Sequence, residues 1–145
     1  IADELLRIGT ETIFVHNRTR ARAEELAQLL GPSIVPVDAQ DMAARTADCG
    51  FVVNTVPATA HAGLPADDIL RPLRDHAVVA DIIYTPLVTP FLVAARHRGH
   101  RTVPGLGMLL HQAVPGFEKW FGVRPLVTPA LYDLVATDID PDYRR

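Results

Sequence analysis

Cysteine and lysine are almost absent from the 145 residues of this sequence, which contains one of each, Cys49 and Lys119. A single cysteine excludes an internal disulfide framework and is typical of a reducing compartment. No apolar run approaches the ~20 residues that a membrane-spanning helix needs, and the first residues do not resemble a signal peptide. The net charge of −3 provides no attraction to nucleic acid. We therefore expect one cytoplasmic domain that binds neither membranes nor nucleic acid.

Short apolar segments alternate with helical ones along the whole sequence. β-Branched and aromatic runs predict strands over residues 12–15, 33–37, 51–54, 77–83 and 101–103. Helices are predicted over residues 1–8, 20–30, 39–46, 90–99, 106–121 and 129–136. Strands that are apolar throughout and alternate with helices predict an α/β fold of the Rossmann type, a doubly wound parallel sheet with helices on both faces.

A glycine-rich turn is missing from this pattern. A dinucleotide-binding fold begins with a strand, a G-x-G-x-x-G turn and then a helix. Residues 1–8 correspond to that helix, so we expect the chain to lack the first strand and its turn. Because the first strand is central in the doubly wound order, residues 12–15 and 51–54 would each present an unpaired edge inside the sheet. The sequence therefore predicts an incomplete fold that is poorly stable alone.

Acidic residues are missing from the turn after residues 12–15, since none occurs between Glu11 and Glu24. In NAD-binding folds an acidic side chain at this place accepts hydrogen bonds from the ribose 2′-hydroxyl. The turn instead offers donors that suit a 2′-phosphate, from Asn17, Arg18, Thr19, Arg20 and Arg22. The alternative is a solvated basic turn in which Thr19 caps the next helix, although basic side chains at a helix start oppose its macrodipole. These residues favour NADP over NAD.

Three motifs are similar to those of the shikimate dehydrogenase family. Residues 17–23 match N-R-T-x-x-R-A, residues 81–90 match D-x-x-Y-x-P-x-x-T-P, and residues 105–112 match G-L-x-M-L-x-x-Q. They follow one another in the family's order and spacing, so the resemblance covers nearly the whole chain. It implies that residues 1–145 are the C-terminal NADP-binding domain of such an enzyme, incomplete at its N-terminus and without the N-terminal substrate domain.

The resemblance implies an oxidoreductase activity, the reversible NADP-dependent reduction of 3-dehydroshikimate to shikimate in the chorismate pathway of aromatic amino-acid biosynthesis. Residues 17–22 would bind the 2′-phosphate and adenosine of the cofactor. The nicotinamide would lie against Ile82, Gly105 and Met108. Glycine at position 105 would permit the backbone to approach a flat ring; a plain turn after Pro104 is the alternative.

Tyr84 and Gln112 are implied to bind substrate hydroxyl groups across a cleft between the two domains. Tyr84 follows a parallel strand at its C-terminal end, where open α/β sheets bind ligands. Gln112 lies in an apolar helical stretch, where its amide needs partners. For either side chain a backbone partner is the alternative. The family's catalytic lysine and aspartate belong to the N-terminal domain, and Lys119 lies outside the matching motifs, so we assign no catalytic residue and no metal site to this chain.

Residues 54–60 depart from the family's N-T-T-P-x-G-M pattern. Val56 replaces a hydroxyl residue and Thr59-Ala60 replaces Gly-Met, so we assign no contacts to this loop. Two other functions remain possible: a relative that acts on quinate and shikimate, and a non-catalytic regulator that retains the fold. We expect Trp120 to lie in the core and Pro115 to kink the long helix over residues 106–121.

Overall fold

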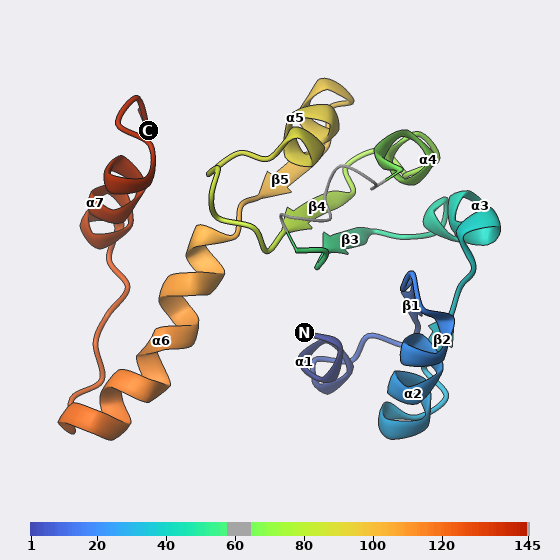
Figure 1. Cartoon of the computed structure of the whole chain (residues 1–145), viewed down its shortest axis with the longest axis horizontal. Coiled ribbons are helices and arrows are strands. Elements are labelled where there is room, and N and C mark those ends of the chain that lie inside the picture. Colours follow the sequence, from blue (N-terminus) through green and yellow to red (C-terminus); the bar gives the residue numbers. More distant parts are fainter. Residues whose placement is uncertain (58–64, 145) are drawn as a thin grey trace.

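The computed structural model describes residues 1–57 and 65–144, which form an α/β fold (Figure 1). Its strands are β1 (Ile13–Val15), β2 (Ile34–Pro36), β3 (Phe51–Asn54), β4 (Val78–Asp81) and β5 (Arg101–Val103). Its helices are α1 (Ala2–Arg7), α2 (Arg20–Leu30), the 3₁₀ helix η1 (Ala39–Asp41), α3 (Met42–Thr46), α4 (Ala66–Leu70), α5 (Pro90–His97), α6 (Leu106–Phe121) and α7 (Pro129–Ile139). Every strand and helix expected from the sequence is present, with bounds that agree to within a few residues.

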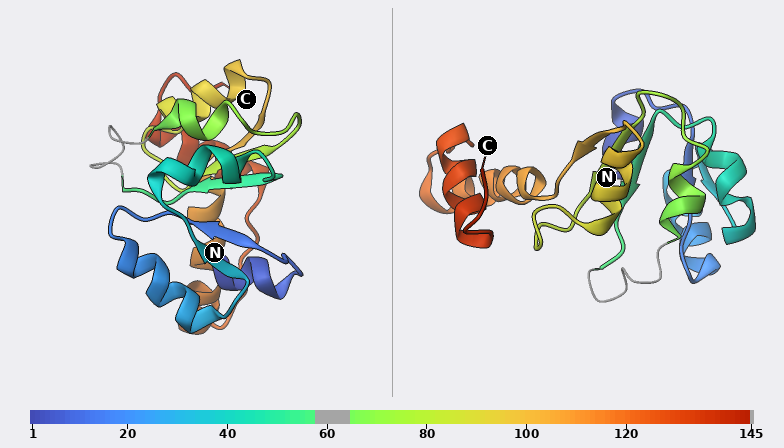
Figure 2. Two further views of the ribbon diagram at one scale, coloured as in Figure 1. Left: turned by 90° about the vertical axis from the view of Figure 1, so that its right-hand side faces the viewer. Right: turned by 90° about the horizontal axis from the view of Figure 1, so that it is seen from above.

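The described strands all pair in parallel, but they form two sheets instead of one. β1 pairs with β2, with Ile13 opposite Ile34. In the second sheet β4 lies between β3 and β5. Within the described residues β1 and β3 therefore have one partner each, and Figure 2 shows these two strands on neighbouring sides of the break. The unpaired edges expected from the sequence are confirmed.

The free edge of β1 is defined by its hydrogen bonds to β2. Ile13 N donates to Ser33 O over 2.8 Å, and Val37 N donates to Val15 O over 2.9 Å. The backbone groups of Ile13 and Val15 are thus directed toward β2. Because successive residues of a strand direct these groups to opposite sides, the N–H and C=O of Phe14 face the break between the sheets.

The free edge of β3 follows from the same geometry. Gly50 O and Asn54 O accept hydrogen bonds from the neighbouring β4 segment, so Phe51 and Val53 direct their backbone groups away from β4. A cavity of about 590 Å³ lies between the two edges, and residues of β1, β3, α1 and α3 line it. The break in the sheet is therefore an open slot bordered by unpaired backbone on both sides.

Two clusters of apolar side chains pack the helices against one another and against the larger sheet. The larger packs α4 and α5 against β4, where Leu70, Val79 and Leu92 are almost completely buried. The smaller joins α6 to α7 through Leu106 and Ala136. Figure 1 shows α6 and α7 extending away from the strands as a pair of helices.

Some local expectations are corrected. Trp120, near the end of α6, is 80 % exposed, so its assignment to the core is wrong. The reason is that the end of α6 extends beyond the strands and the first cluster. Helix α6 continues through Pro115 as one element of 16 residues, and the kink expected there stays a prediction. Helix α4 was not expected from the sequence, because 5 residues are too few to show a helical period.

Gly105, at the N-cap of α6, packs directly against the backbone that follows β4. A Cβ atom at this position would lie 2.6 Å from Ile83 O and closer still to Ile82 O, whereas one at Gly107 would meet no atom within 4 Å. Glycine is therefore required at position 105 by backbone packing. This requirement holds independently of any approach to a cofactor ring.

We expect Gly105→Ala to lower the free energy of unfolding by about 1–3 kcal/mol, because the added methyl group meets rigid backbone. Gly107→Ala is the matched control, since it adds the same group to the same helix in open space. That variant should keep the stability or raise it by up to about 1 kcal/mol, because alanine favours helix. Urea unfolding of the complete polypeptide measures both, and equal effects would contradict this account of Gly105.

Candidate functional site

A buried carboxyl group organises the C-terminal edge of the larger sheet. Asp81, the last residue of β4, is 2 % exposed. Its Oδ1 accepts hydrogen bonds from Asn54 Nδ2 over 3.1 Å and from Ile83 N over 3.0 Å, and its Oδ2 accepts one from Thr89 Oγ1 over 2.7 Å. A buried polar group needs such partners. Asp81 thus joins the end of β3, the loop after β4 and the start of α5.

The two other side chains of this network fix the segments that follow them. Thr89 is the N-cap of α5 and accepts a hydrogen bond from Leu92 N over 3.3 Å, as the Thr-Pro pair in the sequence predicts. Asn54 Oδ1 accepts one from Val56 N over 3.0 Å and so shapes the loop after β3. Thr59 and Ala60, where the sequence departs from the family pattern, lie outside the described residues. Loops from two neighbouring strands therefore meet at one edge, where open α/β sheets bind ligands.

The residues expected to face nicotinamide and substrate lie around this edge. Ile82 is half-buried against Gly105, while Tyr84 is 40 % exposed in the loop between β4 and α5. On α6, Met108 and Gln112 are both exposed and share a helix face, because they are four residues apart. Gln112 is exposed to solvent, and its assignment to a substrate hydroxyl stays a prediction.

The arginine turn, residues 17–22, follows β1 and leads into α2. Asn17 Oδ1 accepts a hydrogen bond from Thr19 N over 2.9 Å, and His16 Nδ1 donates to Val37 O over 3.0 Å. Thr19 occupies the N-cap position of α2, but its side chain makes no capping hydrogen bond. The alternative in which Thr19 caps α2 is therefore correct in position only, and the Asn17 side chain bonds the turn. His16 belongs to none of the motifs in the sequence, yet its bond to Val37 O ties the turn to the end of β2.

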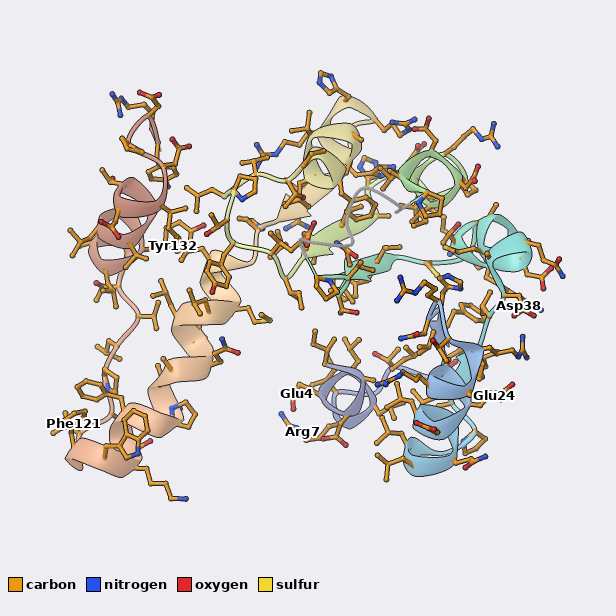
Figure 3. All side chains as sticks on the ribbon, in the orientation of Figure 1. Glu4, Arg7, Glu24, Asp38, Phe121 and Tyr132 are labelled. Atoms are coloured by element: carbon orange, nitrogen blue, oxygen red, sulfur yellow. The ribbon has the colours of Figure 1, made fainter. Side chains whose placement is uncertain are left out.

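The three arginines of this turn are not equivalent. Arg20 Nε donates to Glu24 Oε1 over 2.7 Å, and Arg20 Nη1 pairs with Asp38 Oδ2. Figure 3 labels these two carboxylates, one on α2 and the other beyond β2. Its hydrogen bonds to the carboxylates of Asp38 and Glu24 raise the pKa of the Arg20 guanidinium above its ordinary value. Arg18 and Arg22 are exposed and form no ion pair with any residue that the structure describes.

Other kinds of site find no support in the described part of the chain. Residues 1–57 and 65–144 contain no group of three or more histidine, cysteine or acidic side chains arranged to hold a metal ion. None of their helices combines the length and apolar character needed to cross a membrane. Lys119 is exposed near the end of α6. The described residues thus leave the arginine turn and the edge around Asp81 as the candidate site.

Comparison with known proteins gives consistent matches. A family model described as the shikimate 5′-dehydrogenase C-terminal domain matches residues 105–130. The shikimate dehydrogenase (NADP(+)) of Azorhizobium caulinodans is 48 % identical over 134 residues, which are 92 % of this chain and 48 % of that protein. The corresponding protein of Mesorhizobium japonicum is 47 % identical over 143 residues, 97 % of this chain and 50 % of its own length. The chain spans about half the length of the curated relatives it matches.

Solved structures with the same fold come from the same group of enzymes. Quinate dehydrogenase from Corynebacterium glutamicum in complex with NAD has a TM-score of 0.78 and 28 % identity, covering 94 % of this chain and 50 % of that one. Shikimate 5-dehydrogenase from Thermus thermophilus in complex with NADP(H) and shikimate has a TM-score of 0.72 and 27 % identity, covering 93 % and 48 %. By sequence and by fold, the chain is similar to about half of the length of a shikimate dehydrogenase.

Proposed function

We propose that this chain is the NADP-binding domain of a cytoplasmic shikimate dehydrogenase, which reversibly reduces 3-dehydroshikimate to shikimate on the route to aromatic amino acids. The observation that carries the proposal is the arginine turn, placed at the end of β1 in a chain similar to this family. When bound, the nicotinamide of NADP supplies or accepts the hydride. The chain's own part is to bind and orient the cofactor and to present two side chains to the substrate.

The residues of the turn fit the 2′-phosphate of NADP. Arg18 and Arg22 are exposed and have no carboxylate partner in the described chain, so their guanidinium groups remain available for phosphate oxygens. Asn17 shapes the turn through its bond to Thr19 N. A quinate dehydrogenase with this fold has been solved in complex with NAD, but the lack of an acid between Glu11 and Arg22 favours NADP here.

The edge around Asp81 fits the other half of the cofactor and the substrate. In this proposal the nicotinamide lies against Ile82 and Met108, with Gly105 supporting the loop from behind. Tyr84 and Gln112 are exposed and carry a hydroxyl and an amide, which suit the hydroxyl groups of shikimate.

The slot between β1 and β3 fits one further parallel strand. The backbone groups of Phe14, Phe51 and Val53 border it without partners in the described chain, and such edges are costly unless another strand pairs with them. We assign this strand, and the glycine-rich turn after it, to the part of the polypeptide outside residues 1–145. Residues 1–145 are then an incomplete domain.

The proton-transfer groups belong, in this proposal, to a substrate domain of the same polypeptide. Reduction of a ketone requires a proton donor, and Lys119 is exposed at the far end of α6 from Gly105. Large apolar side chains remain exposed in the C-terminal part of the chain, where that domain could pack: Trp120, Leu126 and Leu134 are 80 %, 81 % and 69 % exposed at the end of α6, in the following loop and on α7. Large exposed apolar patches mark contact surfaces.

Cofactor choice tests the arginine turn. In the complete polypeptide, Arg18→Ala should raise the NADP KM by at least about tenfold, because it removes charged hydrogen bonds worth about 1.5–3 kcal/mol to the 2′-phosphate. The NAD KM should stay almost unchanged. Steady-state kinetics with both cofactors measures the two KM values. An equal rise of the KM for NAD and for NADP would contradict the assignment of the 2′-phosphate to this turn.

Substrate contact is tested on the other side of the site. Tyr84→Phe and Gln112→Ala should each weaken shikimate turnover by about tenfold or more and leave NADP binding unchanged, since each loses a hydrogen bond made only to substrate. Lys119→Ala, on the same helix as Gln112, is the control and should change neither. If NADP affinity falls while shikimate kinetics persist, the altered residue belongs to the cofactor site.

Amide hydrogen exchange tests the slot. In the complete polypeptide the amides of Phe14, Phe51 and Val53 should be strongly protected, because a strand in the slot would accept their hydrogen bonds. The Ile13 amide is the control, because it already donates to Ser33 O and should be protected in either case. If the other three amides exchange rapidly while Ile13 is protected, no strand occupies the slot.

Residues 1–145 alone should lack dehydrogenase activity and a cooperative thermal transition that NADP raises. Loss of a placed proton donor alone typically costs roughly 10²–10⁴-fold in rate, and two unpaired sheet edges weaken the fold. Measurable NADPH formation from shikimate by this chain would contradict the assignment of catalysis to another domain.

A further inference from the structure

One carboxylate lies beside the proposed phosphate site, where a bound phosphate would repel it. Asp38 follows β2, and its Oδ2 pairs with Arg20 Nη1 at the first residue of α2. Glu24 holds the Nε of the same guanidinium over 2.7 Å. All three side chains are about half exposed, so the cluster lies open to any ligand that reaches the turn.

The backbone keeps Asp38 beside the turn. Val37 N donates to Val15 O over 2.9 Å, and His16 Nδ1 donates to Val37 O over 3.0 Å. These two bonds fasten the residue before Asp38 to the end of β1, immediately before the arginine turn begins. The strand pairing therefore places the backbone of Asp38 beside the arginine turn, within reach of Arg20.

A bound phosphate and Asp38 would compete for one cation. Arg20 lies between Arg18 and Arg22 in sequence, yet only Arg20 is engaged by carboxylates in the described chain. Glu24 and Asp38 occupy the Nε and Nη1 groups of Arg20, so an anion can bind through these groups only after at least one carboxylate is displaced. The two carboxylates also offset the positive charge that Arg20 adds to the turn.

We propose that Asp38 limits the affinity of the 2′-phosphate site by retaining Arg20, which makes Asp38 a specificity-determining residue. The inference rests on the proposed function, because it requires the 2′-phosphate to bind at this turn. Removing the Asp38 charge releases Nη1 of Arg20 toward the phosphate. The affinity for nucleotides without a 2′-phosphate should not change on that release.

The test is Asp38→Asn in the complete polypeptide, with adenosine 2′,5′-bisphosphate and AMP as calorimetric probes. The Kd of the bisphosphate should fall about three- to tenfold, the range between an exposed charge pair and a charged hydrogen bond. The Kd of AMP should not change. Asp41→Asn is the matched control, because it removes the same charge from an exposed residue in the next turn; it should leave both Kd values unaltered.

A double variant separates competition from simple repulsion. In an Arg20→Ala background, Asp38→Asn should no longer tighten bisphosphate binding. An equal gain in that background, or an equal gain from Asp41→Asn, would overturn the proposal, because the effect would then be long-range charge. Unchanged bisphosphate binding by a folded Asp38→Asn variant would overturn it as well.

A further variant distinguishes failure of this inference from failure of the proposed function. Arg18→Ala should weaken bisphosphate binding whatever the role of Asp38. If it does so while Asp38→Asn has no effect, only the competition is wrong. If Arg18→Ala leaves bisphosphate binding intact, the phosphate does not bind at this turn and both proposals fail.

Discussion

The carboxyl group of Asp81 is the constraint on which the candidate site depends. It is buried, and a buried polar group without partners costs free energy, so the segments that donate to it must keep their places together. Those segments are the end of β3, the loop after β4 and the N-cap of α5. The loop that carries Ile82 and Tyr84 therefore has both of its ends held by one side chain. Gly105 supports it from behind, because its missing Cβ lets α6 begin against the loop's own backbone.

The arrangement of the two sheets imposes a second constraint. The arginine turn belongs to the sheet of β1 and β2, and the edge around Asp81 belongs to the sheet of β3, β4 and β5. A dinucleotide can contact both only if the distance between the two sheets is fixed. Among the described residues, however, no strand pairing crosses the cavity between β1 and β3. A strand in the slot would both satisfy the unpaired edges and set the distance between the two halves of the cofactor site. Under the proposed function, stability and cofactor binding would then depend on the same strand.

The sequence predicts the helices and strands well because the signals for them are local. The start of α5, for example, is encoded by the two residues Thr89 and Pro90. The missing first strand is predictable from the order of elements, whereas the roles assigned by family resemblance remain predictions. Contacts between distant residues were not predictable: Arg20 is engaged by Asp38, eighteen positions away, and Gly105 is required by the backbone after β4. Trp120 contradicts the usual burial of aromatic side chains, because the end of α6 extends beyond the described core.

The arginine turn shows how far a motif and a folded site can differ in charge. Three cations stand within five positions, but Asp38 and Glu24 surround one of them, so that cluster carries an excess of negative charge beside two unpaired guanidinium groups. Two such groups are enough to balance a phosphate of about −1.5 to −2 charge. A third would tighten binding mainly by slowing dissociation, and a cofactor that must leave after every turnover can make release the slow step. Under the proposed function, the pairing of Arg20 would fit a site that binds NADP firmly enough to select it and loosely enough to release it.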